Sequence, residues 1–219
     1  MEQGKASTIR LLLNFIYPTS GRAMIFGKDV VKYAKEIKQN VGYLPSEVHY
    51  DGDLKVGELL WYSARFYQGV DPRRIKMLAD RFALDLDQRI EDLSFGNRKK
   101  VGIVQAFLHE PKLLIFDEPT NGLDPLMQNV FFELLEEERE KGATIFFSSH
   151  ILIEVQKVCD RVAIIKEGRL VNLESMDSLT RRQVKKITIM LEKDAEVDLK
   201  LSGVVKHTRN GRNITLMYQ

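Results

Sequence analysis

Two adjacent carboxylates, Asp117 and Glu118, follow directly after the uninterrupted apolar run Leu113–Phe116. An apolar run of this length predicts a strand buried on both faces, as in a parallel α/β sheet. Ligands of open α/β sheets bind just beyond the carboxyl ends of the strands, where these two acids lie. Because neighbouring side chains of a strand point in opposite directions, the two carboxylates would have different tasks. The first suits a magnesium ion beside a nucleotide phosphate, and the second, in a drier place, suits a general base that acts on water.

The acidic pair alone is equally compatible with two acids that open a turn before Pro119, so other residues must decide between the two interpretations. Near the N-terminus, Gly4 and Lys5 match the end of the phosphate-binding pattern G-x-x-x-x-G-K-[ST]. In that pattern, backbone N–H groups at the start of a helix surround a phosphate. A Gly-Lys pair by itself is weak evidence, and it gains weight only from motifs further along the chain.

Two other places have side chains suited to phosphate chemistry. Ser94 is a natural N-cap, and Gly96 lets the backbone approach a ligand closely, so this helix start is a candidate phosphate site. The structural alternative there is an ordinary N-cap. His150 follows the expected strand Ala143–Phe147, whose end would lie beside the acidic pair. A lone histidine is more often structural, so His150 by itself decides nothing.

The order and spacing of these motifs resemble the ATP-binding subunit of ABC transporters. The resemblance is carried by Asp117–Asp124 (DEPTNGLD), by Leu93–Asn97 (LSFGN) and by His150, and it covers residues 4–172. Within that family the chain looks most like the ATPases of bacterial drug and antibiotic exporters.

The resemblance implies ATP and Mg²⁺ as ligands and assigns a role to each motif. Glu118 would activate the attacking water, and His150 would contact the γ-phosphate and hold that water in line. Asp117 would bind the metal, with Ser46 as a weak second contact. The nucleotide-binding residues expected from the resemblance are Gly4, Lys5, Ser7, Thr8, Ser94, Gly96 and Asp124.

The same resemblance implies two protein partners. In the family the Ser94–Gly96 motif covers the γ-phosphate of the opposite protomer, and the loop with Asp124 crosses the dimer. We therefore expect a second ATP-binding subunit, in the simplest case an identical copy. We also expect a separate transmembrane permease, which would place the protein on the inner face of the cell membrane and would determine the cargo.

The chain departs from the family pattern at three places. Ala6 stands where the family has the Ser or Thr whose hydroxyl binds magnesium, and Ser46-Glu47 replaces a Gln that touches the metal. Relative to the family, the chain is also expected to be truncated at both ends. These departures support an alternative function, a nucleotide-binding scaffold subunit or remnant with impaired catalysis.

Composition narrows the remaining classes of protein. The 219 residues are 44% hydrophobic and 29% charged, which is typical of a globular protein. The net charge of +2 gives no indication of nucleic acid binding. Cys159 is the single cysteine, which fits a reducing compartment, and neither a membrane-spanning run nor a signal peptide is evident. We expect a cytoplasmic protein that reaches the membrane through its permease.

The elements that must position these residues predict an α/β fold with a parallel sheet, and the resemblance implies that this fold is a P-loop NTPase of the ABC type with a mostly parallel sheet. An inserted helical subdomain is expected at about residues 48–100, within an ATP-binding domain of residues 1–172. Residues 173–219 are expected to form part of a small α+β appendage, with Asn210-Gly211 at a tight turn. The expected strands are 23–26, 40–44, 113–116, 143–147, 161–165, 169–171, 184–191, 204–208 and 214–218. The expected helices are 8–15, 58–67, 72–82, 98–108, 126–140 and 151–159.

Asp124 is expected to cap the helix 126–140 with Pro125 at the first helical position, and its acids Glu133, Glu136, Glu137 and Glu138 are expected to face water. The run Arg98–Lys100 is expected to be solvated, and the strand 143–147 is expected to be buried.

Overall fold

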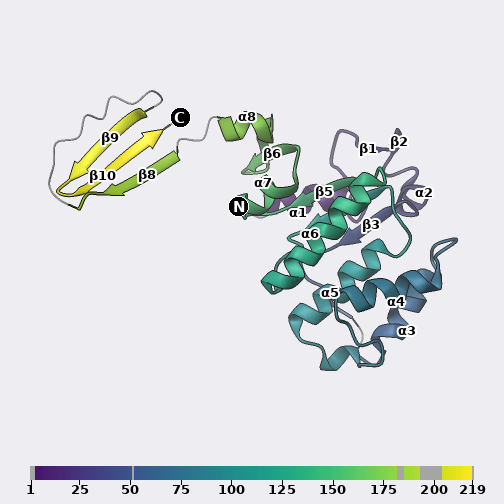
Figure 1. Cartoon of the computed structure of the whole chain (residues 1–219). Coiled ribbons are helices and arrows are strands. Elements are labelled where there is room, and N and C mark those ends of the chain that lie inside the picture. Colours follow the sequence, from purple (N-terminus) through teal and green to yellow (C-terminus); the bar gives the residue numbers. More distant parts are fainter. Residues whose placement is uncertain (1–2, 51, 182–184, 193–203, 219) are drawn as a thin grey trace. The chain divides into compact units, whose positions relative to one another are not determined.

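The computed structural model describes residues 3–50, 52–181, 185–192 and 204–218 (Figure 1). The chain forms two compact units, one of residues 1–158 with 166–169 and the other of residues 159–165 with 170–219. The domain boundary expected at residue 172 stays a prediction. Within the described ranges, every helix is too short or too polar to cross a lipid bilayer.

A parallel sheet forms the centre of the first unit, with the strand order β3-β4-β5. Its strands are β3 (Val41–Leu44), β4 (Leu113–Asp117) and β5 (Thr144–Ser148). Every residue of β4 is buried, as its apolar run predicts. The expectation that β5 is also buried is wrong, since Phe146 is 41% exposed. Among the described strands β5 pairs with β4 alone, so one edge of β5 has no strand neighbour.

Helices cover both faces of β4. The side chains of a strand alternate between its two faces, and in β4 both sets are apolar from Leu113 to Phe116 and must be buried. On one face, Leu113 and Ile115 pack with Ile9 of α1 (Gln3–Leu12). The hairpin of β1 (Met24–Ile25) with β2 (Lys28–Asp29) and the short α2 (Ala34–Lys38) complete this cluster. On the other face, Leu114 and Phe116 join the larger core.

The larger core is built mainly from the helices that follow β3. These are α3 (Val56–Ala64), α4 (Pro72–Arg81), the 3₁₀ helix Ile90–Asp92 and α5 (Phe95–Phe107). Asp71 caps α4 by accepting a hydrogen bond from the backbone N–H of Arg73. The helices lie where the inserted subdomain is expected, and α5 packs against β3.

Helix α6 (Pro125–Glu140) follows the acidic strand end and contacts β5. Asp124 is its N-cap and Pro125 its first residue, as predicted. The expectation that Glu138 faces water is wrong, because Glu138 is 2% exposed and binds Arg74 of α4. Helix α7 (Leu152–Val158) then follows β5.

The second unit contains two small sheets. Strands β6 (Arg161–Lys166) and β7 (Arg169–Ser175) pair with each other, and α8 (Met176–Arg181) follows. Strands β8 (Lys185–Met190), β9 (Val204–Asn210) and β10 (Asn213–Tyr218) form an antiparallel sheet in the order β8-β10-β9. The β9–β10 turn includes Gly211, as predicted, whereas the expected strand start at Val184 lies outside the described residues.

Candidate active site

The acidic pair lies at the carboxyl end of β4, and β5 holds it in place. The Ser148 hydroxyl donates a hydrogen bond of 2.5 Å to Asp117 Oδ1. The backbone N–H of Glu118 donates to the Ser148 carbonyl oxygen at 3.1 Å. Glu118 has a φ of +48°, a conformation that non-glycine residues rarely adopt and that is found disproportionately at functional sites. This turn of the backbone directs the two neighbouring carboxylates to different partners.

The carboxylate of Glu118 is the point where three elements meet. Lys5 Nζ of α1 lies 3.8 Å from Oε1, and His150 Nδ1, just after β5, lies 2.8 Å from Oε2. The Glu118 side chain is only 9% exposed, whereas that of His150 is 57% exposed. A buried base beside a solvent-accessible imidazole and a cation is an arrangement suited to activating water next to a phosphate.

Lys5 is held in place by the segment that follows β5. Its ammonium donates a hydrogen bond of 2.9 Å to the carbonyl oxygen of Ser149. The helix was expected to begin at residue 8, after a loop, but α1 begins at Gln3 and contains Gly4, Lys5, Ser7 and Thr8. The Thr8 hydroxyl donates to the Gly4 carbonyl oxygen one turn earlier, at 2.8 Å.

The turn that carries His150 is fixed by its preceding residue. The Ser149 hydroxyl donates to the buried carboxylate of Glu154 at 2.8 Å and accepts a hydrogen bond from the backbone N–H of Ile151. Sequence reasoning missed the parts played by Ser148, Ser149 and Glu154. The signal that could have identified the two serines is their position between a strand and His150.

A second group of candidate residues lies at the start of α5. Ser94 caps α5 by accepting a hydrogen bond from the backbone N–H of Asn97. An added Cβ on Gly96 would lie 2.5 Å from the Gly122 carbonyl oxygen, so glycine is needed for packing within this chain as well as for any ligand. The Phe95 ring also lies against Gly122.

Asp124, the remaining nucleotide-binding candidate, accepts a hydrogen bond from the backbone N–H of Met127 at 2.9 Å. Within the described residues, no hydrogen bond or ion pair joins the Ser94 or Asp124 side chains to Lys5, Glu118 or His150. The structure therefore joins Lys5, Asp117, Glu118 and His150 at one strand end, with Gly4, Ser7 and Thr8 on the same helix as Lys5. Ser94 and Asp124 instead cap α5 and α6.

The expectation that the run Arg98–Lys100 is solvated is wrong for Lys99, which is 1% exposed. Its ammonium donates to the carbonyl oxygens of Pro45 and Ser46, at 3.0 and 2.8 Å. Burial lowers the pKa of Lys99 to about 8, while the nearby carboxylates of Asp117, Glu118 and Glu47 favour its charged form. Lys99 therefore places an ammonium group within electrostatic range of the acidic pair.

The side chains fit a magnesium ion that shares its coordination with phosphates. In the described part of the chain, no three His, Cys, Asp or Glu residues form a cluster able to hold a metal by themselves. Magnesium bound beside a nucleotide needs only one or two carboxylates plus phosphate oxygens and water. Asp117 can supply one such carboxylate, since only Oδ1 is engaged by Ser148. Ser46 remains a weak candidate.

Comparison with known proteins gives a consistent family assignment. Residues 3–121 match the family model for "ABC transporter". The ABC transporter ATP-binding protein NatA of Bacillus subtilis (strain 168) is 35% identical over 80% of this chain and 74% of its own length. The bacitracin transport ATP-binding protein BcrA of Bacillus licheniformis is 36% identical over 86% of this chain and 62% of its own length.

A solved structure agrees with these sequence relatives. The ATP-binding subunit of an ABC transporter superposes with a TM-score of 0.75 at 31% identity, over 82% of this chain and 77% of that chain. The predicted α/β fold of the ABC type is thereby confirmed. This chain spans less than two thirds of the length of BcrA.

Proposed function

Because the chain belongs to the ABC transporter family of ATP-binding proteins, a family of ATPases, we propose that it binds Mg-ATP and hydrolyses it to power a membrane exporter. The exported molecules would be drugs, antibiotics or similar small molecules, a class that the name of the bacitracin transport relative supports. The observation that carries the proposal is the convergence of Lys5 and His150 on the buried carboxylate of Glu118.

In the proposed reaction, this chain contributes positioning and charge rather than a covalent intermediate. Glu118 accepts a proton from the attacking water, and the exposed imidazole of His150 orients that water toward the γ-phosphate. The ammonium of Lys5 neutralises the β- and γ-phosphates, with Gly4, Ser7 and Thr8 around it. A magnesium ion held by Asp117, with Ser46 as a weaker ligand, would neutralise further charge on the same phosphates.

The proposed active form is a dimer. The side chains of Ser94 and Asp124 cap their own helices and are not bonded to Lys5, Glu118 or His150 within the described residues. In the proposed dimer, a second copy would supply Ser94, Gly96 and Asp124 to the nucleotide that these three residues bind. The exposed ring of Phe95, at 55% exposure, lies on the face that would meet that copy.

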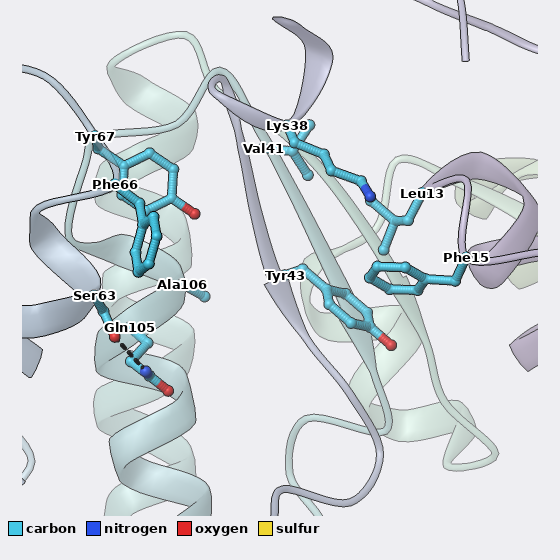
Figure 2. Close-up of a pocket in the computed structure, with 10 residues that line it drawn as sticks. All are labelled: Leu13, Phe15, Lys38, Val41, Tyr43, Ser63, Phe66, Tyr67, Gln105 and Ala106. Carbon is cyan, nitrogen blue, oxygen red and sulfur yellow. Dashed lines mark hydrogen bonds between the residues drawn. The ribbon is translucent and has the colours of Figure 1, made fainter. Parts of the chain in front are cut away.

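The proposed partner in the membrane is a separate permease, which would hold this chain at the inner membrane surface. A pocket of about 320 Å³ between β3, α3 and α5 supports this part of the proposal. Figure 2 shows Phe15 and Tyr43 on one side of the pocket and Phe66 and Tyr67 on the other, where Gln105 donates a hydrogen bond to Ser63. Aromatic side chains on an open, partly polar pocket suit the docking of a helix end from another subunit.

A second candidate function is nucleotide binding without effective hydrolysis. The specific observation in its favour is Ala6, which lacks the hydroxyl that would bind the metal at this position of α1. Under this alternative the chain would be a scaffold subunit that closes on ATP without turning it over.

Calorimetric titration with Mg-ATP, run beside a phosphate-release assay, separates the two candidates. Binding together with turnover is the expected result, and binding without turnover would favour the scaffold function. Lys5→Ala is expected to weaken Mg-ATP binding at least about tenfold, because a charged hydrogen-bond donor is lost. Lys112→Ala, which removes an exposed lysine just before β4, is the matched control and should bind normally. Absence of binding in the unmodified protein would contradict both candidates.

A further inference from the structure

Lys99 is a buried cation that the proposed reaction does not use. It lies in the second turn of α5, and its side chain is almost fully enclosed at 1% exposure. Burying an ammonium group is costly unless it is hydrogen-bonded and lies near opposite charge. A neutral residue of similar size would avoid that cost, so the position of this charge requires an explanation.

The ammonium of Lys99 joins α5 to the segment that follows β3. It donates to the carbonyl oxygens of Pro45 and Ser46, at 3.0 and 2.8 Å. Both bonds have a charged donor, and such bonds are about twice as strong as neutral ones. Lys99 therefore fixes the backbone of the residue pair that precedes the exposed Glu47.

The next turns of the same helix face contact the same segment. At Gly102, three residues on, an added Cβ would lie 2.7 Å from Leu44 Cδ1 and 3.1 Å from Val48 Cγ2. Gln105, three residues further, accepts a hydrogen bond of 2.5 Å from the Tyr50 hydroxyl. Residues three apart lie on one side of a helix, so α5 and residues 44–50 are fastened along a continuous line.

Two candidate functional groups lie near Lys99, at the N-terminal end of this line. The N-terminus of α5 carries the Ser94–Gly96 turn, and the fastened segment carries Ser46, the weak metal candidate. The carboxylates that face the Lys99 ammonium are Glu47 on the segment and Asp117 and Glu118 at the end of β4. Lys99 thus lies where α5, the loop after β3 and the acidic strand end meet.

We propose that Lys99 is a positioning residue, which holds the Pro45–Ser46 backbone against α5. Because Leu44 of β3 pairs with Phe116 of β4, this contact would fix Ser46 at the same end of the sheet as Asp117. This inference rests on the proposed function for its role in hydrolysis, whereas the fastening of the loop is testable without nucleotide. Lys99 acts through the loop and touches neither water nor phosphate in the proposed reaction.

The first test measures the loop in the nucleotide-free protein. Cleavage by a glutamate-specific protease after Glu47 requires the segment to leave α5, whereas Glu167 lies in an exposed turn and serves as an internal reference. Lys99→Met is expected to raise the cleavage rate at Glu47, relative to Glu167, at least about tenfold, the factor for losing a charged hydrogen-bond donor. Lys99→Arg keeps charge and donors and should stay close to the unmodified protein. Lys100→Met removes the neighbouring, less buried charge and should change nothing.

The second test uses the metal. In hydrolysis assays, Lys99→Met is expected to raise the Mg²⁺ concentration needed for half-maximal rate several-fold, with unchanged affinity for ATP in the absence of metal. An unchanged cleavage rate at Glu47, an equal rise at both glutamates, or equal effects of Lys99→Met and Lys99→Arg would overturn the inference. If the unmodified protein shows no turnover, the proposed function fails, and the cleavage test still decides the role of Lys99.

Discussion

At the scale of single residues, buried ionisable groups determine how the protein responds to pH. His109 lies between α5 and β4 and stacks on Tyr67, with ring centroids 3.6 Å apart. Burial lowers the pKa of His109 to about 4 from the ordinary 6.5, and the positive charge of Arg74 acts in the same direction. The folded protein therefore keeps this imidazole neutral at a pH where the unfolded chain protonates it.

This difference predicts a loss of stability in mild acid. As pH falls from about 7 toward 4, the unfolded state binds a proton that the folded state does not, so the free energy of unfolding decreases. The full contribution of His109 is up to about 3 kcal/mol, reached near pH 4. Urea unfolding of His109→Phe, which keeps an aromatic ring against Tyr67, should show a smaller decrease over this range.

His49 provides the control for that measurement, because it is an exposed histidine in the same unit. His49→Gln should follow the pH dependence of the unmodified protein. Identical slopes for His109→Phe and the unmodified protein would show that His109 contributes nothing to acid sensitivity.

The candidate site could be predicted in part at this scale. Strand ends in a parallel sheet bring their next residues together, which is why Glu118 and His150 could be expected to be neighbours. The burial of Lys99 and Glu138 could not be predicted, because charged residues within a helix usually face water. Glu138 is buried by Arg74, which lies 64 residues earlier in the chain, and local sequence carries no signal of that pairing.

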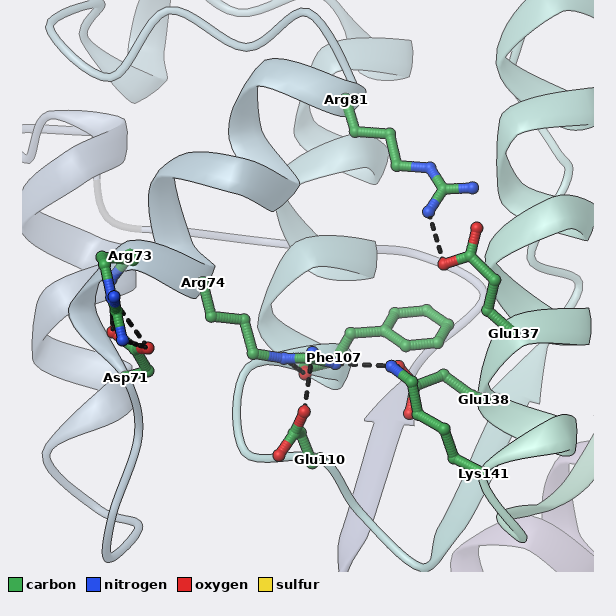
Figure 3. Close-up of polar contacts among 9 residues, drawn as sticks. All are labelled: Asp71, Arg73, Arg74, Arg81, Phe107, Glu110, Glu137, Glu138 and Lys141. Atoms are coloured by element: carbon green, nitrogen blue, oxygen red, sulfur yellow. Dashed lines mark hydrogen bonds and ion pairs between the residues drawn. The ribbon is translucent and has the colours of Figure 1, made fainter.

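At the scale of elements, α4, α5 and α6 are joined by one arginine. Figure 3 shows the Arg74 guanidinium reaching the carbonyl oxygen of Phe107 and the carboxylates of Glu110 and Glu138, at 3.0, 2.9 and 2.9 Å. Lys141 also donates to Glu138 at 2.9 Å. The side chains of Arg74 and Glu138 are 9% and 3% exposed, so this ion pair is largely shielded from solvent.

Breaking this pair from one side should be strongly destabilising. Arg74→Met leaves the buried carboxylate of Glu138 with Lys141 alone and removes the donor to Phe107, so we expect a loss of about 3 kcal/mol in the free energy of unfolding. The double variant Arg74→Met with Glu138→Met should recover part of that loss, because no uncompensated charge remains. Denaturant unfolding measures both.

An exposed ion pair on the same helix serves as the control. Arg73 binds Asp71 at 2.9 Å, yet the Arg73 side chain is 90% exposed (Figure 3). Arg73→Met should leave the unfolding midpoint unchanged, since solvent-exposed pairs add little stability. A double variant no more stable than Arg74→Met would contradict the assignment of the loss to a buried unpaired charge.

Longer elements could be predicted from sequence more reliably than short ones. The apolar runs gave β3 and β4 to within a residue. Helical spacing of apolar residues located the start of α4, and the Asp124-Pro125 cap located the start of α6. The elements α2, β2 and α8 were missed, since they have two to six residues and too little periodicity. The start of α1 was placed five residues late because its first turn is polar.

At the scale of the whole molecule, the first unit supplies one half of each proposed site. In the proposed dimer, Lys5, Glu118 and His150 of one copy would carry out the hydrolysis, and Ser94, Gly96 and Asp124 of the other copy would complete the site. Sequence could not predict how far β5 would be exposed, because that depends on which strands lie beside it. The family assignment, in contrast, followed from the order of motifs along the chain and is confirmed by the comparisons.

The central claim is that Glu118 is the base for ATP hydrolysis. Steady-state turnover of Mg-ATP by Glu118→Gln tests it most directly, with Glu140→Gln, an exposed acid at the end of α6, as the control. We expect Glu118→Gln to lose turnover by at least about 100-fold, the usual contribution of a general base, while Mg-ATP binding persists and the control stays active. Turnover by Glu118→Gln at the rate of the unmodified protein would contradict the account.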